Sequence, residues 1–575
     1  MTKNILNLIL LISASLFLIF GFITPYHFEP WRSAFSEFGV FIGMALVLIS
    51  TSLKYRDYLA PKIKIFFLIL LLSLAGLFIH GENNQFITES NYLFLFYICF
   101  GYICFIIGFN EKKNKNIILI LMASFFIGSI LQVGTGLAQW LGLFDAITVD
   151  NWWGAQGKGG QRVSGNLLQA NNYATYILVG FLSFFYITNQ QENVGKLKFS
   201  MFSQILIPSF FSVGLVIAQS RTSILSILIA SVLIYLCRRK FSQQLLKIWL
   251  IFASATLLLW YLIPALAGIV FVESADAVAR AFVSADLRFK AWPIFIQSAF
   301  ESFQTIFFGR GWGSIASVHV NYAATALQNN IGFGIFAHTH NIFIDIFVAF
   351  GVIGLALFIY LLVALYPSVH HALSNTESLT LLLILLVFFI HANLELPHWY
   401  GYFLWPAAFI TGLIYNSSTQ LTDIRSTYLM GFIISICVLG IHVFDKYLTF
   451  EKALSSYALQ VYQRGMVYEP VNLDTKMLPG LSELFSISEL NINEPPSTHN
   501  YIRIYHAARF SPSAFTISRA IYAAALSLKY DDYVYFSTAY CRIFGNDSFL
   551  KVNRRARALT TDFRHPELPD DCRSN

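Results

Sequence analysis

Residues 336–355 read FAHTHNIFIDIFVAFGVIGL, a short polar head followed by an apolar run in which Asp345 is the only charged residue. An apolar run of this kind predicts a helix that enters a membrane. The head raises a chemical question, because His338, Thr339, His340 and Asn341 stand directly before the apolar residues. Three explanations are open at this point: a metal site, a catalytic base, or histidines that merely anchor the helix at the membrane interface.

The rest of the chain shares this apolar character. Of its 575 residues, 56% are hydrophobic and only 12% are charged, and the mean hydropathy is +0.60. Water-soluble domains of this size do not have such a composition, so the sequence predicts an all-α, polytopic helical membrane protein. No small-residue cleavage site follows the first apolar stretch, residues 5–23, which is therefore interpreted as a retained helix.

The charges in the loops predict the orientation of about 13 transmembrane helices. Basic loops follow the even-numbered apolar segments and are assigned to the cytoplasm, and the loops between them face the exterior, or periplasmic, side. These loops account for the net charge of +7, so nucleic-acid binding is not predicted. The basic loops are KYRDYLAPKIK (54–64), NEKKNKN (110–116), NQQENVGKLK (189–198), CRRKFSQQLLK (237–247) and, more weakly, TDIRST (422–427).

Two domains are predicted. Residues 1–445 form the transmembrane domain, with a large exterior loop at 270–340, and residues 446–575 form a soluble periplasmic α-helical domain. The helical patterns YIRIYHAARF (501–510) and ISRAIYAAALSLKY (517–530) support the second assignment, although they indicate no repeat. Cysteines 99, 104, 237 and 437 are interpreted as small apolar filler, whereas Cys541 and Cys572 in the tail are able to pair in an oxidising compartment.

Several arginines lie on the predicted exterior side. Arg162 belongs to RVSGNLLQANNYAT (162–175), Arg221 to AQSRTS (218–223) and Arg288 to DLRFKAW (286–292). A guanidinium group is suited to bind phosphate, which would explain why a protein with basic cytoplasmic loops also holds arginines at exterior helix ends. The alternative for Arg221 and Arg288 is that their side chains reach out to lipid headgroups.

The two histidines are spaced i, i+2, which places them on opposite sides of a helix. The pair therefore lacks the geometry of a helical zinc site, although His319, Glu395 and His398 are further potential ligands. If Thr339 or Asn341 caps the following helix, His340 lies next to the positive end of the helix dipole, which disfavours imidazolium. A neutral imidazole at an aqueous face is a suitable general base.

Other polar and aromatic residues on the exterior side admit both a functional and a structural interpretation. Glu37 and Glu395 are lone carboxylates at helix ends, where pairing with an arginine or contact with a substrate would explain them. The glycine-rich stretch GAQGKGGQRVSGN (154–166) lacks the spacing of a nucleotide-binding loop. Aromatic residues that could stack on sugars, or simply form an interfacial belt, are Trp152, Trp153, Trp312, Tyr400 and Tyr402.

These stretches together resemble a known family. RFKAWPIFIQSAFESFQTIFFGRGWGS (288–314), followed by HTHNIFIDIFVAFGVIGL (338–355), is similar to the core of the bacterial O-antigen ligase and polymerase (WaaL/Wzy) superfamily. TPYHFEPWRSAFSEF (24–38), RVSGNLLQANNYAT (162–175) and NLELPHWYGYFLWP (393–406) resemble loops of its PglL-type O-linked protein oligosaccharyltransferases. The resemblance covers about residues 25–406, and this chain has Gln-Ala-Asn-Asn where many relatives have a proline.

The resemblance implies transfer of a preassembled oligosaccharide from undecaprenyl diphosphate to Ser or Thr hydroxyls of exported proteins, commonly a type IV pilin, without metal or cofactor. It implies an inner-membrane enzyme whose active site faces the periplasm. His340, Arg288 and Arg221 take the catalytic positions, His340 as the base and the arginines on the leaving diphosphate. Substrate-binding positions fall on Arg162, Gln169, Asn171, His338, Asn341, Glu37, Tyr400, Tyr402 and Trp312.

Other functions remain open on the sequence. An O-antigen ligase or polymerase would use the same chemistry with a different acceptor. A polyprenyl-glycan transporter is expected to hold charges at mid-membrane or to show internal repeats, whereas the polar residues here gather on one face.

Overall fold

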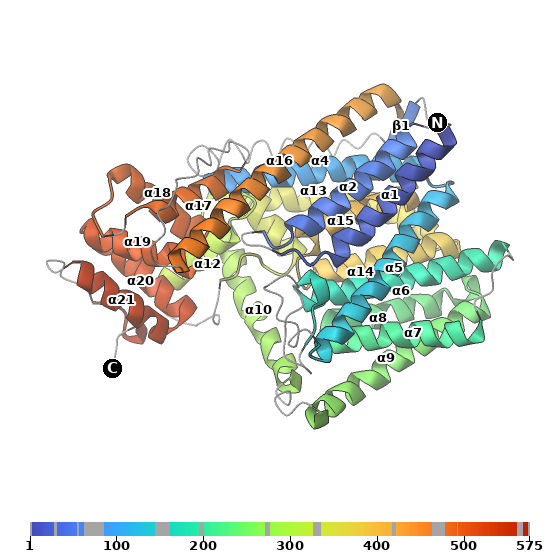
Figure 1. The fold of residues 1–575 in the computed structure, drawn as a ribbon, viewed down its shortest axis with the longest axis horizontal. Coiled ribbons are helices and arrows are strands. Elements are labelled where there is room, and N and C mark those ends of the chain that lie inside the picture. Colours follow the sequence, from blue (N-terminus) through green and yellow to red (C-terminus); the bar gives the residue numbers. More distant parts are fainter. Residues whose placement is uncertain are drawn as a thin grey trace. The chain divides into compact units, whose positions relative to one another are not determined.

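The computed structural model describes twelve stretches of the chain: residues 3–27, 31–53, 57–61, 85–143, 162–194, 200–270, 277–325, 335–416, 421–462, 478–491, 493–560 and 567–572. These stretches are almost entirely helical, which confirms the predicted all-α class (Figure 1). Trp152, Trp153 and most of the glycine-rich stretch lie outside the described residues.

Seven described helices are long and apolar enough to cross a membrane, and the chain is a multi-pass membrane protein. A continuous helix suits a bilayer because every backbone N–H and C=O group is paired within the segment itself. The seven spans are 5–23, 34–52, 85–110, 115–140, 243–263, 342–372 and 426–452, and shorter apolar helices cover 201–217, 221–236, 376–392, 401–414 and 514–526. The total of about 13 crossings stays a prediction.

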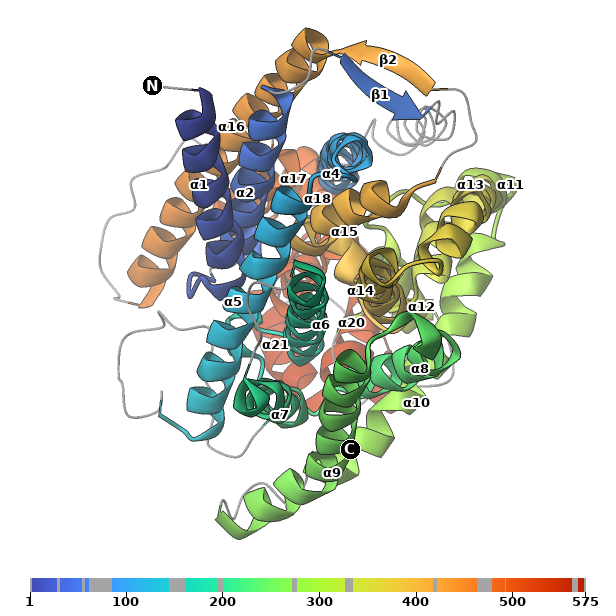
Figure 2. The same ribbon diagram turned by 90° about the vertical axis from the view of Figure 1, so that its right-hand side faces the viewer.

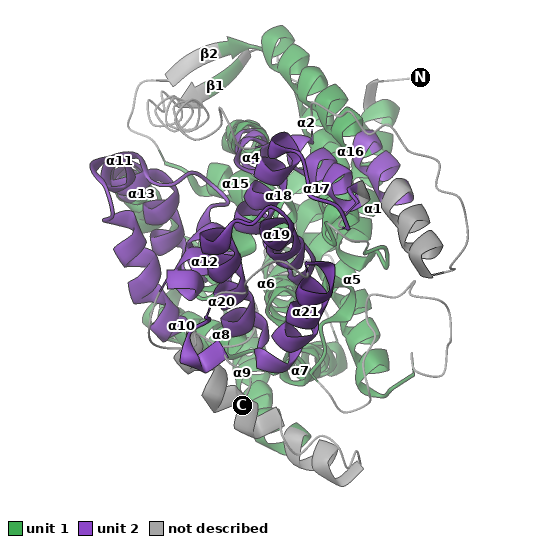
Figure 3. Cartoon of the chain, turned by 90° about the vertical axis from the view of Figure 1, so that its left-hand side faces the viewer, with its two compact units in different colours: residues 1–64, 96–283, 361–444 green, residues 65–95, 284–360, 445–575 purple. Residues whose placement is uncertain are grey.

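The chain forms two compact units (Figure 3). Unit 1 comprises residues 1–64, 96–283 and 361–444, and unit 2 comprises residues 65–95, 284–360 and 445–575. Four of the described helices contribute residues to both units: α4 (Gln85–Asn110), α10 (Ala277–Ala299), α13 (Ile342–Ala372) and α16 (Ser426–Tyr462). The predicted domain boundary at residues 445/446 stays a prediction.

Unit 1 is a bundle of apolar helices (Figure 2). Its helices are α1 (Lys3–Ile23), α2 (Ala34–Ser52), α5 (Lys115–Trp140), α6 (Ala170–Val194), α7 (Met201–Ile217), α8 (Arg221–Leu236), α9 (Gln243–Val270), α14 (Thr376–Ala392) and α15 (Gly401–Ile414). Glycine allows α2 to approach α1 closely, since a Cβ atom added at Gly43 would lie 2.8 Å from the Leu18 side chain.

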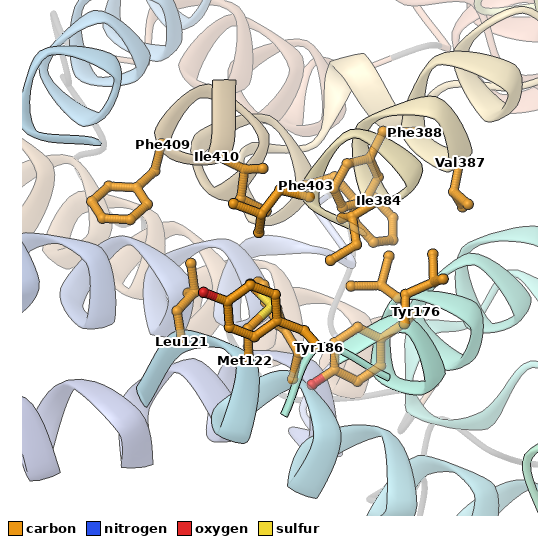
Figure 4. Packing of buried hydrophobic residues seen from close by; sticks show 14 of the residues in the cluster. Leu121, Met122, Tyr176, Tyr186, Ile384, Val387, Phe388, Phe403, Phe409 and Ile410 are labelled. Carbon is orange, nitrogen blue, oxygen red and sulfur yellow. The ribbon is translucent and has the colours of Figure 1, made fainter. Parts of the chain in front are cut away.

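Large apolar side chains fill the centre of unit 1. The ring of Phe22 on α1 stacks on that of Tyr176 on α6, with centroids 3.9 Å apart. Aromatic packing of this kind joins helices that carry the polar residues described below. Figure 4 shows part of this core: Leu121 and Met122 from α5, Tyr176 and Tyr186 from α6, Ile384, Val387 and Phe388 from α14, and Phe403, Phe409 and Ile410 from α15.

Unit 1 also contains one short antiparallel ribbon that the sequence did not predict. Strand β1 (Asp57–Pro61) pairs with β2 (Leu421–Arg425), and the register places Asp57 opposite Arg425. Both strands belong to loops that the charge pattern assigns to the cytoplasm. Pairing them satisfies backbone groups of two segments that are far apart in the sequence.

Unit 2 combines helices of the predicted exterior loop with those of the tail. Its helices, besides the parts of α4, α10, α13 and α16, are α11 (Phe303–Phe308), α12 (Ile315–Thr325), α17 (Pro479–Glu489), α18 (Thr498–Phe510), α19 (Ala514–Leu526), α20 (Tyr530–Phe544) and α21 (Asn546–Leu559). Val320 and Ala323 of α12 are part of the tail's hydrophobic core. The helical character predicted for residues 501–510 is confirmed, and that of 517–530 is confirmed up to Leu526, where α19 ends.

The tail helices form a repeat that sequence patterns alone did not reveal. α18 and α20 begin at residues 498 and 530, and α19 and α21 begin at 514 and 546, so both pairs are offset by 32 residues. Buried positions follow the same offset, as in Ile504 and Phe536, or Ala520 and Val552. Helices α18 to α21 therefore form two consecutive helical hairpins that repeat every 32 residues.

Candidate active-site residues

The predicted base lies in a tightly held turn, residues 338–341, at the start of α13. Asn341 caps the helix, because its Oδ1 accepts hydrogen bonds from the backbone N–H groups of Phe343 (3.0 Å) and Ile344 (3.2 Å), as predicted. His340 is half-buried and has a φ angle of +58°, in the left-handed region. A left-handed non-glycine residue persists only where its surroundings hold it, which is typical of functional sites.

A buried carboxylate fixes this turn from within α13. Asp345 is almost fully buried, and its Oδ1 accepts hydrogen bonds from the backbone N–H (2.9 Å) and the hydroxyl (2.5 Å) of Thr339. The ring centroids of His338 and His340, on either side of Thr339, are 4.6 Å apart. The single charge in the opening stretch of sequence thus holds the backbone from which both imidazoles project.

α10 contacts the same turn. The indole Nε1 of Trp292 donates a hydrogen bond of 2.8 Å to the backbone carbonyl of Thr339. Arg288, which is half-buried, precedes Trp292 by four residues and therefore lies on the same face of α10. The structure thus brings the RFKAW segment into contact with the HTHN segment, and Arg288 shares the helix face of Trp292 that meets the His340 turn.

The glycine-rich segment after α11 supports α13 from a second direction. α13 is broken at Gly351, whose φ is +65° and ψ −162°, so carbonyl groups of the preceding turn lose their helical partners. The backbone N–H groups of Arg310 and Gly311 donate to the carbonyls of Val348 (2.8 Å) and Ala349 (3.0 Å). A Cβ atom at Gly309 would lie 2.3 Å from the backbone of Ala349, so only glycine fits there.

His319 is a buried structural histidine. Its Nδ1 accepts a hydrogen bond of 2.9 Å from the backbone N–H of Phe336, two residues before His338. Burial lowers the pKa of His319 to about 4, which keeps the ring neutral and able to accept this bond. Across the described ranges, no group of three or more His, Cys, Asp or Glu side chains is arranged to hold a metal ion.

Unit 1 holds a second polar cluster, the Gln-Asn network, formed by Gln169, Asn171, Glu395, Arg162 and Ser220. Glu395 is 2% exposed, and its two carboxylate oxygens accept hydrogen bonds from the side-chain amides of Gln169 (3.0 Å) and Asn171 (2.8 Å). The Oδ1 of Asn171 accepts from Arg162 (2.9 Å) and from the Ser220 hydroxyl (2.8 Å). The network therefore joins the start of α6, the start of α8 and the turn after α14.

Two arginines lie at the edge of this network. Arg162 donates through Nε to the carbonyl of Ala218 at 2.9 Å, while its side chain remains exposed. Arg221 is exposed and directly follows Ser220, the N-cap of α8. The positive ends of the α6 and α8 dipoles and these two guanidinium groups give this part of unit 1 a favourable electrostatic environment for an anion.

The remaining predicted residues are half-buried or buried. Tyr402 is 2% exposed and accepts a hydrogen bond of 2.9 Å from Asn172, whereas Tyr400, stacked on it, is half-buried. Glu37 accepts hydrogen bonds from the hydroxyls of Ser33 (2.8 Å) and Tyr97. Trp312 packs against Phe94 and Phe350 and is 9% exposed, which leaves little of its ring for a sugar.

Sequence reasoning missed several residues that hold these clusters. It noticed Asp345 and Glu395 but assigned neither to the site, and it did not single out Trp292 or Ser220. A signal existed for the two carboxylates, because an isolated charge in or beside an apolar run requires a partner. Nothing in the sequence distinguishes Ser220 from the many other hydroxyl residues of the membrane segments.

Two family models match parts of this chain. The O-antigen ligase family matches residues 206–359, which include Arg221, Arg288 and His340. A family described as the C-terminal part of a virulence factor membrane-bound polymerase matches residues 379–532, which include Glu395 and Tyr400.

Two relatives from Acinetobacter baylyi match over most of their length. A ComP-specific O-oligosaccharyltransferase is 24% identical over 533 residues, which cover 91% of this chain and 92% of the relative. A general O-oligosaccharyltransferase is 22% identical over 451 residues, 74% of each chain. These matches confirm the resemblance to the PglL-type O-oligosaccharyltransferases of the O-antigen ligase and polymerase superfamily, and the chain is a glycosyltransferase of this kind.

Proposed function

We propose that this glycosyltransferase moves a preassembled oligosaccharide from undecaprenyl diphosphate to Ser or Thr hydroxyls of exported proteins, with a type IV pilin as the first candidate acceptor. The enzyme acts in the bacterial inner membrane with its active site facing the periplasm. The names of both relatives support transfer of an oligosaccharide to oxygen, and the name of one indicates specificity for a single acceptor, ComP. The positive-inside pattern of the loops supports the orientation.

The observation that carries this proposal is the His340 turn. Hydrogen bonds from Asp345, Trp292 and the Asn341 cap hold the backbone of this turn in one conformation. The half-buried imidazole of His340 projects from that backbone. A Ser or Thr hydroxyl is a weak nucleophile at neutral pH, and His340 removes its proton as the oxygen attacks the anomeric carbon. Pre-positioning the base removes the cost of orienting it during the reaction.

The arginines act on the leaving group. As the glycosidic bond breaks, negative charge grows on the diphosphate, and a guanidinium group placed there stabilises the transition state more than the ground state. Arg288 and Arg221 take this role, with Arg162 held by Asn171 as a further contact. Direct displacement predicts inversion at the anomeric carbon. No metal or cofactor takes part in the proposed reaction.

The other polar residues bind and orient the two substrates. Gln169 and Asn171 hold the network that carries Arg162, and His338 and Asn341 flank the base. Tyr400 is the better candidate for a sugar contact, because Tyr402 is buried and bonded to Asn172. Glu37 lies beside these tyrosines, where the backbone N–H of Gly401 also donates to it (3.4 Å).

Glycosylation in a host lacking its own oligosaccharyltransferase tests the function. The chain is co-expressed with a pilin and a lipid-linked glycan, and the intact mass of the pilin is measured. We expect a mass increase of one whole glycan with the native chain and none with His340→Ala. His499→Ala, at an exposed histidine of the tail, serves as the matched control and should leave transfer unchanged. Full transfer by His340→Ala would remove the proposed base.

The same experiment separates the alternatives. Glycosylated lipopolysaccharide beside an unmodified pilin would identify an O-antigen ligase, and lengthened lipid-linked glycan would identify a polymerase. Movement of the lipid-linked glycan across the membrane without any transfer would identify a transporter.

A further inference from the structure

α12 lies between the tail and the helices that carry the His340 turn, all within unit 2. Val320 and Ala323 belong to the hydrophobic core of the tail. Ile315 and Val318, on the same helix, belong to a second cluster whose other buried members are Ala291 and Phe295 of α10 and Val348 of α13. One short helix therefore contributes to two hydrophobic clusters, so a shift in its position disturbs the packing of both.

The tail binds the C-terminal end of α12 through Arg542 on α20. The Nη1 of Arg542 donates a hydrogen bond of 3.0 Å to the carbonyl of Ala323, in the last turn of α12. Carbonyl groups in a last turn lack helical partners, and a cation there also complements the negative end of the helix dipole. A second contact lies two residues earlier on α12, where the hydroxyl of Tyr535 donates to Asn321 Oδ1 at 3.4 Å.

Arg542 is itself held by the C-terminal end of the chain. Its Nε and Nη2 bond to the two carboxylate oxygens of Asp571 at 2.8 and 3.3 Å, and its side chain is only 11% exposed. A disulfide joins Cys541 to Cys572, the neighbours in sequence of Arg542 and Asp571. The disulfide therefore keeps the two partners of the ion pair together and leaves Nη1 directed at α12.

α12 continues this chain of contacts to the proposed base. His319, near its middle, accepts the backbone N–H of Phe336. The Phe336 ring lies edge-on to His319, with centroids 5.4 Å apart, and to His340, at 5.9 Å. The position of α12 thus determines where residue 336 lies, four residues before the base.

We propose that Arg542, backed by Asp571 and the Cys541–Cys572 disulfide, is a positioning residue that holds His340 in place through α12. The inference rests on the proposed role of His340. The tail then contributes to the chemical step itself, and its contribution depends on an oxidised disulfide, which suits a domain exposed to an oxidising compartment.

Steady-state transfer by the full-length enzyme tests the proposal. Arg542→Ala should lower kcat by roughly ten- to a hundredfold, because a displaced catalytic group loses effective molarity, with KM for the acceptor unchanged. Arg542→Lys should recover part of kcat, since lysine reaches a carbonyl but cannot bind both oxygens of Asp571. Arg554 is an exposed arginine of α21 that takes no part in the contacts of Arg542 with α12 and Asp571. Arg554→Ala should therefore behave as the native enzyme.

The disulfide allows a second, independent test of the proposal. Cys541→Ser/Cys572→Ser should lower kcat in the same direction, and treatment with a thiol reductant should lower the native rate while leaving the double variant unaffected. Equal sensitivity of both proteins to the reductant would overturn the role of the disulfide.

Hydrogen–deuterium exchange measures how firmly the turn before and around His340 is held, and it does not depend on an activity assay. In Arg542→Ala, the amides of residues 335–341 should exchange faster than in the native chain, while those of α18 and α19 stay protected. Unchanged exchange in residues 335–341, or a rise in acceptor KM with unchanged kcat, would overturn the proposal. Absence of transfer by the native enzyme would instead count against the proposed function, so the two failures are distinguishable.

Discussion

At the residue scale, the carboxylate of Glu395 accepts one hydrogen bond on each oxygen, from Gln169 and from Asn171. Glu395→Gln keeps the size of the side chain but turns one acceptor into a donor, so one of the two amides loses its partner. Losing a buried hydrogen bond of this kind costs about 1–3 kcal/mol, and we expect transfer to fall by on the order of tenfold or more as Arg162 loosens. Intact-mass measurement of the acceptor checks this.

Glu377→Gln is the matched control for Glu395. Glu377 lies in the first turn of α14, the helix that precedes Glu395, and its ion pair with Lys115 (3.3 Å) is largely exposed. An exposed pair contributes little, so transfer by this variant should equal that of the native chain. Equal loss in both variants would show that α14 tolerates no change of charge and that the network is not specific.

His319 gives a pH prediction at the same scale. Burial lowers its folded-state pKa to about 4 from the ordinary value near 6.5, so the unfolded chain binds the proton more readily between these two values. Stability is then complete above about pH 6.5 and falls as the pH drops toward 4, by at most about 1.4 kcal/mol per pH unit. His319→Asn keeps an acceptor near Nδ1 but does not titrate.

Thermal unfolding of the purified protein between pH 7 and pH 4 measures this effect. The melting temperature of His319→Asn should fall less steeply with acidification than that of the native chain. Parallel curves for the two proteins would contradict the prediction.

At the scale of elements, the break in α13 is what lets the Arg310–Gly311 segment bond to it. Gly351 has a φ of +65°, and a Cβ atom there would lie 2.5 Å from the backbone of Phe307. Gly351→Ala therefore meets both a backbone conformation that essentially only glycine adopts, which costs about 1–3 kcal/mol for other residues, and a clash with backbone. We expect lower stability and lower transfer, because the start of α13 carries the His340 turn.

Gly431→Ala, in α16, is the control for this element. A Cβ atom at Gly431 meets nothing within 4 Å, and alanine favours a helix over glycine by about 1 kcal/mol. Its melting temperature should match or exceed that of the native protein, whereas Gly351→Ala should melt lower. Similar melting temperatures for both variants would show that the kink is not required.

At the scale of the whole molecule, the predicted topology is open to direct test. The free cysteines Cys99, Cys104, Cys237 and Cys437 are replaced by alanine, and single cysteines are introduced at the exposed residues Arg239 and Glu494. In intact spheroplasts, a membrane-impermeant maleimide should label Glu494→Cys and should label Arg239→Cys only after lysis. The reverse pattern would invert the orientation derived from the loop charges.

Much of the architecture was predictable because it depends on local properties of the chain. Hydropathy averaged over twenty residues identifies apolar helices wherever they occur, and the positions of lysine and arginine orient them. The tail helices followed from their own periodicity, but their 32-residue offset did not, because its buried pairs differ in size, as Ile504 and Phe536 do. The β1–β2 ribbon escaped prediction because its two strands are separated by most of unit 1 in the sequence.

Residue types and their spacing were enough to predict the membrane class, the family resemblance and the candidate residues His340, Arg288 and Arg221. The groups that hold these residues became evident only from the folded chain. Asn171 and Glu395 are 224 residues apart, and Arg542 and Ala323 are 219 apart. Hydrogen bonds over such separations are set by how helices pack, and local sequence patterns do not encode that packing.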